Sequence, residues 1–224
     1  MRDIKILLND SRLCAVFKPC GMPSQADKTG DTDLVSYLEK YLNTPLNIIN
    51  RLDRPVSGIT LFAKDGSTAA ALSRDMQEGG FVKEYEAVLC GVPDKRNGIF
   101  TDFLFKDQRS NISRVVKEGV KGAKAAKLEY TVLDTVDDEE FETLSLVKIR
   151  LFTGRHHQIR VQFASRGVPL WGDAKYNAAF IRRRGRFAIA LCACGLKFRH
   201  PQTGETVELS ARDTSGAFEK FLLR

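Results

Sequence analysis

The feature of the sequence that most constrains the fold is a series of short apolar segments separated by turn-forming residues. Asn9, Asp10 and Ser11, for example, separate the segments 5–8 and 13–17. Turns this short join neighbouring strands into antiparallel hairpins. Helical periodicity is limited to a few stretches, at 33–42, 67–78, 155–165 and 217–223. We therefore predict an α+β fold with a mixed, mostly antiparallel central sheet flanked by a few helices.

Two of the predicted helices carry capping signals. Asp31 or Thr32 is the expected N-cap of helix 33–42, and Ser67 is the expected N-cap of helix 67–78. Both residue types accept hydrogen bonds from the first free N–H groups of a helix, so they fix where the helix begins.

The length of the chain, 224 residues, suits one large domain, and no repeat or linker divides it. We predict a single domain over residues 1–224. No apolar run reaches the roughly 18 residues of a membrane span. The N-terminus also lacks the apolar block of a signal peptide. These observations favour a cytoplasmic protein without membrane contact.

The charge balance favours a polyanionic partner. Lys and Arg number 35 against 28 Asp and Glu, which gives a net charge of +7. Nucleic acid is the commonest polyanion in a cell. Candidate phosphate contacts are the basic run 182–186 and the lysines Lys117, Lys121, Lys124 and Lys127. A solvated surface explains both clusters equally well.

The five cysteines are odd in number and irregularly spaced, which favours reduced thiols over a disulfide framework. Cys192 and Cys194 alternate along a predicted strand, so both face the same side. A zinc site usually needs about four ligands in two pairs, and the sequence offers no second pair. We therefore predict core thiols and no metal.

One carboxylate stands between two arginines. Asp53 follows Arg51 and precedes Arg54, in a loop directly before the apolar strand 58–64. Loops that display a charged group from a rigid sheet are common places for catalysis. Nearby cations lower the pKa of a carboxyl group and keep it ionised, which suits a nucleophile. A surface salt bridge is the alternative interpretation.

A second polar group gathers in the segment 153–160. A helix beginning near Arg155 would place His156 and Arg160 on one face and would point His156 and His157 in different directions. A helix N-terminus with Arg and His favours an anion. An amphipathic helix with solvated basic residues is the alternative.

Six short motifs follow one another in a fixed order. They are Phe17-Lys18-Pro19-Cys20-Gly21, Arg51-Leu52-Asp53 with Ser57-Gly58, Ala63-Lys64, Lys83-Glu84-Tyr85, Gly154-Arg155-His156-His157-Gln158-Ile159-Arg160 and Gly172-Asp173-Ala174-Lys175-Tyr176. This order resembles the RluA class of pseudouridine synthases over about residues 10 to 210. The resemblance implies isomerisation of uridine to pseudouridine in ribosomal or transfer RNA, on a mixed, mostly antiparallel sheet without a metal or an organic cofactor.

The resemblance also implies roles for single residues. Asp53 matches the essential aspartate of the family, and Tyr85 matches a tyrosine that packs against the target nucleotide. Arg155 matches the arginine that pairs with the catalytic carboxylate. We therefore expect these three residues to carry the chemistry.

Four further residues are expected to bind the substrate. Arg51 matches an arginine that helps to displace the target base from its stack, and Leu170 falls where the family places an aliphatic residue against the base. His157 and Arg160 belong to the same motif as Arg155, and we expect both to contact RNA.

Three positions depart from the family pattern. Asn50 and Gln162 stand where the family usually has His, and Val56 stands where it usually has Thr. The departures leave the subgroup open. Because few residues precede Asp53, we expect this chain to lack the N-terminal S4 RNA-binding domain that many members carry. We also expect a monomer, as is usual for such enzymes.

Two other functions stay open. The three departures favour a catalytically silent RNA-binding domain, and His156, His157 and Asp173 would be the ligands of a metal-dependent hydrolase. For the synthase, the sequence does not choose between attack of Asp53 on the sugar and elimination to a glycal. It also does not identify the modified RNA or uridine.

Overall fold

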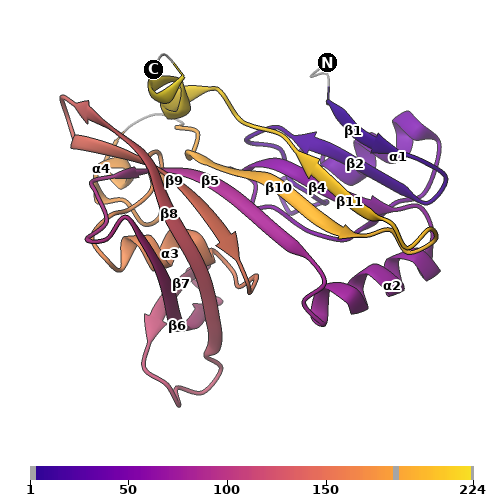
Figure 1. The fold of residues 1–224 in the computed structure, drawn as a ribbon, viewed down its shortest axis with the longest axis horizontal. Coiled ribbons are helices and arrows are strands. Elements are labelled where there is room, and N and C mark those ends of the chain that lie inside the picture. The colour runs from indigo at the N-terminus through magenta and orange to yellow at the C-terminus, as the bar shows by residue number, and fades with distance from the viewer. Residues whose placement is uncertain (1–3, 184–186, 223–224) are drawn as a thin grey trace. The chain divides into compact units, whose positions relative to one another are not determined.

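The computed structural model describes residues 4–183 and 187–222 (Figure 1). Contacts divide the chain into two compact units. Unit 1 comprises Met1–Lys83 and Cys192–Asp213, and unit 2 comprises Glu84–Leu191 and Thr214–Arg224. Each unit is thus assembled from two separate stretches of chain, and the expectation of a single domain stays a prediction.

Unit 1 is a sheet with one helix on each face. Its strands follow the order β1-β2-β4-β10, with β11 beside β10 and β3 beside β4. The pairing of β4 with β10 is parallel, whereas β1 with β2, β2 with β4, β3 with β4 and β10 with β11 pair antiparallel. The elements are β1 (Ile6–Asn9), β2 (Leu13–Lys18), α1 (Leu34–Leu42), β3 (Asn47–Ile48), β4 (Ser57–Ala63), α2 (Gly66–Gln77), β10 (Leu191–Arg199) and β11 (Thr206–Ser210).

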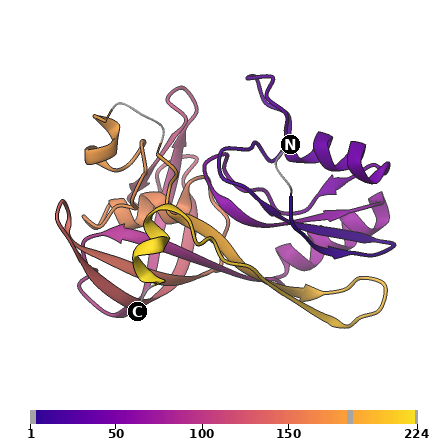
Figure 2. The ribbon, with the colours of Figure 1, turned by 90° about the horizontal axis from the view of Figure 1, so that it is seen from above.

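Strand β4 is buried along its whole length because both of its faces are covered. Leu72 of α2 belongs to one core cluster with Ile59 and Leu61 of β4. Leu38 of α1 belongs to a second cluster with Phe62, which points to the opposite face. Figure 2 shows the two helices on either side of these strands. This double cover fixes the start of β4, where the candidate site begins.

The helix caps differ from those predicted. Asp33 caps α1 and Asp65 caps α2, each accepting a hydrogen bond from the N–H three residues further on. The predictions of Asp31, Thr32 and Ser67 as caps are therefore wrong. The helices begin at Leu34 and Gly66, so the residue directly before each of them takes the N-cap position, and in both places its carboxylate favours the positive end of the helix.

Unit 2 is an antiparallel sheet with the strand order β5-β9-β8-β6-β7. Phe163 of α3 is fully buried, with its ring 5.2 Å from that of Phe100 and 5.5 Å from that of Tyr130. These contacts hold α3 on the sheet. The elements are β5 (Val82–Cys90), β6 (Asn97–Asp107), β7 (Ile112–Val116), β8 (Lys124–Asp138), β9 (Glu142–Leu151), α3 (Gln158–Ala164), α4 (Ala178–Ile181) and a 3-10 helix (Gly216–Phe221).

The predicted fold class is confirmed. Strands dominate, helices are few, and the one parallel pairing among the described strand pairs makes the sheet mixed. The predicted helix at 217–223 is a short 3-10 helix that ends at Phe221, and residue 223 lies outside the described residues. Among the described residues, no helix is long and apolar enough to cross a membrane.

Candidate active site

Asp53 lies on the loop that leads into β4 of unit 1. Its carbonyl accepts a hydrogen bond from the Val56 N–H at 2.9 Å, which closes a turn. Asn50 ties the start of the loop to β4, because its Nδ2 donates to the Ile59 carbonyl at 3.0 Å and its Oδ1 accepts from the Leu61 N–H at 2.8 Å. The Asp53 side chain is half-buried on a loop held at both ends.

Ser24 holds the middle of the same loop. Its buried hydroxyl donates to the Leu52 carbonyl at 2.7 Å and accepts from the Leu52 N–H at 3.2 Å. The Leu52 side chain is buried as well. The residue directly before Asp53 is therefore fixed by its backbone and by its side chain.

Lys18 lies fully buried under this turn. Its ammonium donates to the carbonyls of Pro19, Met22 and Arg54 at 3.1, 2.8 and 3.2 Å. Burial lowers the pKa of Lys18 to about 8, while Cys20 and the Asp53 carboxylate oppose part of that shift electrostatically. Lys18 thus joins the loop after β2 to the turn that carries Asp53.

The two arginines that flank Asp53 differ. Arg54 donates to Thr29 at 3.0 Å and forms ion pairs with Asp27 and Asp31. Its guanidinium is therefore committed to the acidic loop at 27–31. Arg51 is exposed.

Gly58 allows β10 to pass close to the Asp53 loop. Its φ is +123°, and a Cβ at this position would lie 2.4 Å from the Ala193 carbonyl oxygen and 2.5 Å from the Ala193 nitrogen. No side chain fits such an approach without moving the backbone. Gly58 is thus required by the parallel pairing of β4 with β10.

In unit 2, Arg155 lies on a loop before α3. The Gln158 Oε1 accepts from the Thr153 hydroxyl at 2.8 Å and from the Arg155 N–H at 3.0 Å. The Arg155 Nε donates to the Ala125 carbonyl at 2.9 Å, and the Lys127 N–H donates to the Thr153 hydroxyl at 2.8 Å. These bonds pin the loop to the start of β8 and leave the Arg155 side chain exposed.

The helix after this loop begins later than predicted. α3 starts at Gln158, because His157 adopts a left-handed conformation with φ 54° and ψ 26°. Arg155 and His156 therefore lie outside the helix, and the predicted common face of His156 and Arg160 is wrong. The prediction that the two histidines diverge is also wrong, since their rings stack with centroids 3.7 Å apart. A left-handed residue between loop and helix has no signal in helical periodicity.

A hydrogen-bond network fixes the two histidines. The Tyr176 hydroxyl accepts from the Ser113 N–H at 2.8 Å and lies 2.9 Å from the His157 Nδ1. The hydroxyl and the His157 Nδ1 thus share a hydrogen bond, whose direction is set by the tautomer of His157. The Ser113 hydroxyl in turn donates to the His156 carbonyl at 2.8 Å and lies 2.9 Å from the His156 Nδ1.

Burial and nearby cations keep His157 neutral. Burial is the larger cause, and Arg160, His156, Lys175 and Lys106 add to it, so that the pKa of His157 is lowered to about 2. A neutral, buried imidazole contributes no charge to RNA binding. The contacts of His157 thus indicate a positioning residue, and its role as a substrate contact stays a prediction.

Arg160 forms a buried ion pair with Asp173. Its Nε and Nη2 donate to the two carboxylate oxygens at 2.8 and 2.7 Å, and the two side chains are 5% and 0% exposed. Asp173 also accepts from the backbone N–H groups of Lys175 and Tyr176. The pair therefore holds the segment 173–176 on α3, and contact of Arg160 with RNA stays a prediction.

The two remaining predicted residues of unit 2 lie on or beside β5. Tyr85 is a half-buried residue of β5, opposite Ile149 of β9. Leu170 is fully buried and forms a bridge with Leu89 of β5. The structure thus brings Tyr85 and Leu170 to one strand of unit 2, whereas Arg51 and Asp53 belong to unit 1.

The basic clusters separate into different environments. Lys117 and Lys121 are exposed on the loop between β7 and β8, and Lys124 and Lys127 are exposed on β8. In the other cluster, Arg182 is exposed, Arg183 stacks 4.7 Å from the Phe180 ring, and residues 184–186 lie outside the described residues.

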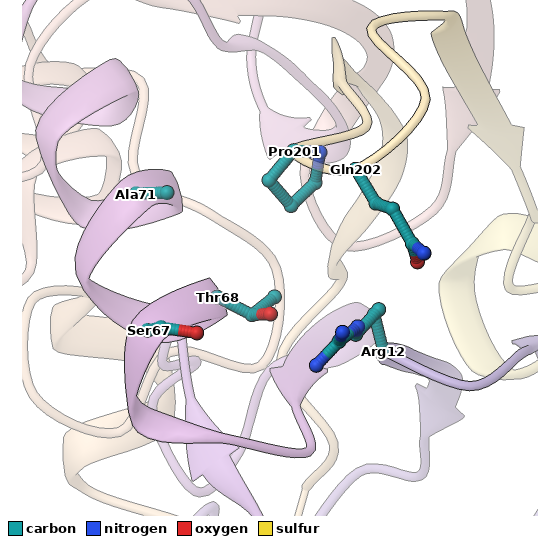
Figure 3. A pocket seen from close by; sticks show the side chains of 6 residues that line it. All are labelled: Arg12, Ser67, Thr68, Ala71, Pro201 and Gln202. Atoms are coloured by element: carbon teal, nitrogen blue, oxygen red, sulfur yellow. The ribbon is translucent and has the colours of Figure 1, made fainter.

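One cavity of unit 1 lies away from the predicted site residues. It has a volume of about 220 Å³ and lies between the start of α2 and the turn after β10 (Figure 3). Its lining residues are Arg12, Ser67, Thr68, Ala71, Pro201 and Gln202. Arg12 is already paired with Asp65 at 3.2 Å, so the cavity presents no free cation for an anionic ligand.

Within residues 4–183 and 187–222, no three His, Cys, Asp or Glu side chains group in a way that could hold a metal ion. The hydrolase alternative requires such a group from His156, His157 and Asp173. All three side chains are already engaged, His156 with Ser113, His157 with Tyr176 and Asp173 with Arg160. Cys192 and Cys194 are buried thiols, as predicted.

Sequence reasoning missed the residues that support the site. Lys18 was noticed only as part of a motif, although a lysine that ends the apolar run of β2 directly before Pro19 is a signal of a buried charge. Gln158 and Tyr176 were likewise noticed only as parts of motifs, because their bonds to Lys127 and His157 join residues 31 and 19 positions apart in the sequence.

Comparisons with known proteins give the class of this chain. The family model described as RNA pseudouridylate synthase matches residues 12–165. The chain therefore belongs to the RNA pseudouridylate synthase family. The resemblance inferred from the six motifs is confirmed.

Individual relatives cover most of this chain. The chain is 29% identical over 213 residues to ribosomal large subunit pseudouridine synthase C of Pasteurella multocida, matching 92% of this chain and 64% of that protein. It is 30% identical over 223 residues to tRNA pseudouridine synthase C of Haemophilus ducreyi, matching 93% of this chain and 90% of that protein. The chain thus spans less than two thirds of the first relative and nearly all of the second.

The solved structure of human RNA pseudouridylate synthase domain containing 1 is similar in fold. Its TM-score is 0.79 at 23% identity, over 95% of this chain and 84% of that one. At this identity the likeness shows the fold alone.

Proposed function

We propose that this protein isomerises uridine to pseudouridine in structured RNA, with the carboxylate of Asp53 as the reacting group. The observation that carries the proposal is the placement of Asp53, half-buried on a turn fixed by Lys18, Ser24 and Asn50 within the matched part of the family. A carboxylate on a backbone held this firmly suits a preorganised nucleophile.

The proposed reaction needs no external reactant. The bond between C1′ and N1 of uridine breaks, the uracil turns, and C1′ bonds to C5 instead. C5 loses its proton to solvent, and N1 takes up a proton, so atoms and electrons balance. Asp53 either attacks the sugar or assists elimination to a glycal, and Tyr85 and Arg155 keep the roles that the resemblance implies.

The RNA substrate is proposed to be ribosomal or transfer RNA, the two kinds named in the relatives. The target uridine must leave its stack, which costs a few kcal/mol and is easiest in loops. The net charge of +7 favours binding of the RNA backbone. A location in the cytoplasm and a monomeric state belong to the same proposal.

The departures from the family pattern do not favour a silent RNA-binding domain. Asn50 bonds to β4 through both ends of its amide. Val56 is buried, and Gln162 is buried with its Nε2 donating to Asp102 at 2.6 Å. All three residues have structural contacts that account for them.

The proposal is tested with RNA that carries tritium at C5 of uridine, because C5 loses its hydrogen in the reaction. Purified wild-type protein should release tritium from ribosomal or transfer RNA. Asp53→Asn should lose activity by a factor of at least about 10³, as expected when a nucleophile is removed. Its thermal unfolding should match that of the wild type.

Asp137→Asn is the matched control, because Asp137 is an exposed aspartate of unit 2 outside the proposed site. It should release tritium at the wild-type rate. Normal turnover by Asp53→Asn would show that the assignment of the reacting group is wrong.

A further inference from the structure

We propose that Phe152, with Lys127 and Arg150 beside its ring, forms a stacking platform for an unpaired nucleotide of the RNA substrate. The platform lies on unit 2. This inference rests on the proposed function for the identity of the partner, and it adds a substrate contact that none of the six motifs contains.

The Phe152 side chain faces away from the core. In β9, Ile149 and Leu151 are buried, at 0% and 7% exposed, whereas Phe152, directly after the end of the strand, is 43% exposed. Side chains alternate along a strand, so Arg150 and Phe152 lie together on the outer face. The Phe152 ring therefore lies on the outer face of the strands and is partly open to solvent.

Two cations lie over the Phe152 ring. The Lys127 Nζ is 5.0 Å and the Arg150 Cζ is 5.2 Å from the ring centroid. Leu128 pairs with Leu151, so Lys127 lies across from Phe152 on the neighbouring strand. Both cations are within the range of a cation–π contact. The surface therefore offers an aromatic face and positive charge in one place.

The backbone under the platform is fixed. The N–H groups of Phe152 and Thr153 both donate to the Lys127 carbonyl, at 3.2 and 3.3 Å. The Lys127 N–H donates back to the Thr153 hydroxyl at 2.8 Å. Three residues further on, the Nε of Arg155 is bonded to the Ala125 carbonyl. The platform is therefore continuous with the loop that carries Arg155.

Acidic residues limit the positive surface on one side. Glu84 and Glu129 lie opposite Arg150 in the two neighbouring strands. At the start of β8, Lys124 and Lys127 are exposed, and Arg155 is exposed on the loop before α3, which is bonded to this part of β8. The charge is thus positive around the ring and toward Arg155.

A nucleotide matches this surface in both respects. Its base has a flat face that stacks on an aromatic ring or a guanidinium, and its phosphate pairs with the ammonium. An acidic peptide would satisfy the cations but would leave the ring exposed. Bases inside a duplex are already stacked, so the platform requires an unpaired nucleotide.

The test measures equilibrium binding to a short, fluorescently labelled oligouridylate and to a blunt RNA duplex. Phe152→Ala and Phe152→Leu should each weaken oligouridylate binding by about tenfold, the effect of losing one stacked base. Phe152→Tyr should retain wild-type affinity. Duplex affinity should be the same in all four proteins.

Salt dependence separates the ring from the cations. Lys127→Gln should reduce the slope of log affinity against log salt by about one, since one phosphate contact is lost. Phe152→Ala should leave this slope unchanged, because the ring carries no charge. Tyr41→Ala and Lys40→Gln on α1 are matched controls, since Tyr41 is 66% exposed and Lys40 is also exposed. Both should bind oligouridylate like the wild type.

Three results would overturn the platform. They are wild-type affinity of Phe152→Ala for oligouridylate, an equal loss for oligouridylate and duplex, and failure of the wild type to bind oligouridylate. The tritium assay on the wild type reports the isomerase activity separately. Binding differences between the variants without tritium release by the wild type would support the platform and contradict the proposed reaction. Tritium release without binding differences would support the reaction and contradict the platform.

Discussion

In each unit, a buried charged side chain fixes the position of a loop. Lys18 is fully buried and bonds to three backbone carbonyls, whereas Arg160 is buried against the carboxylate of Asp173. A buried charge needs such partners, because an unsatisfied one costs several kcal/mol. In both places the charge joins segments that are distant in the sequence.

The lowered pKa of Lys18 predicts a specific dependence of stability on pH. Burial lowers the pKa from 10.5 to about 8, so between these values the unfolded chain binds more protons than the folded one. The free energy of unfolding should therefore rise with pH across this window, by about 2 kcal/mol between pH 8 and 10 from this residue alone. In Lys18→Met this contribution should be missing.

Urea denaturation of both proteins at pH 8 and pH 10 measures the difference. Other groups titrate alike in the two proteins, so they cancel. Parallel stability profiles would mean that Lys18 keeps an ordinary pKa.

The pair of Arg160 and Asp173 predicts a large loss of stability when one partner is removed. Asp173→Asn would leave the guanidinium buried at 5% exposure without its carboxylate. The expected cost is about 3–5 kcal/mol. Chemical denaturation measures it, and Asp137→Asn should cost almost nothing, because Asp137 is exposed. Equal stability of the Asp173 variant and the wild type would contradict a structural role for the pair.

For single residues, the sequence predicted which side chains have reactive groups better than it predicted which residues those side chains contact. Asp53 stood out because a loop carboxylate between two arginines is visible in a few letters. The commitment of Arg54 to Asp27 and Asp31 was not visible, since these partners lie more than 20 residues away along the chain.

At the scale of elements, residues of one motif form hydrogen bonds with residues of another motif or beside it. Lys18 and Cys20 of the first motif bond to the carbonyls of Arg54 and Pro55, which lie between the two parts of the second motif. In unit 2, Tyr176 of the last motif contacts His157 of the fifth. Segments that depend on each other for their conformation must be present together, which gives a physical reason for the six motifs in one chain.

Gly58 predicts the strongest effect of a small substitution. In Gly58→Ala the new Cβ would meet the Ala193 backbone at 2.4 Å, in a conformation with φ +123°. The strands would have to separate, at a cost of at least about 2–3 kcal/mol. Thermal unfolding measures this loss.

Gly66→Ala is the matched control for this experiment. Gly66 lies in the first turn of α2, and nothing lies within 4 Å of its added Cβ. It should be neutral or slightly stabilising, because Ala favours helices. A Gly58→Ala protein as stable as the control would show that β10 does not approach β4 as described.

Element types were predictable and their boundaries were not. Alternation in β8 and β9 indicates a hairpin directly, and the structure pairs these strands from Leu128 to Asp138. The start of α3 depends on the left-handed backbone of His157, which periodicity does not report. Boundaries follow from single hydrogen bonds, whereas element type follows from the pattern of many residues.

At the scale of the whole molecule, the pattern of apolar residues was enough to predict the fold class. Short strands with close turns indicated a mixed, mostly antiparallel sheet, and the structure confirms it. The division into two units was not predictable, because it depends on the parallel pairing of β4 with β10, which joins residue 57 to residue 192. Such a contact leaves no local signal in the sequence.

The same pairing has a consequence for synthesis. Ser57 and Gly58 meet Cys192 and Ala193, which the ribosome adds only after every strand of unit 2 has been made. Before β10 is made, Ser57 and Gly58 have no strand beside them on this edge of β4, and the place that the Ala193 backbone will take against Gly58 is empty. Residues 1–83 of unit 1 must therefore avoid aggregation while the strands of unit 2 are being made. Unit 1 is complete only when the hairpin of β10 and β11 pairs with β4.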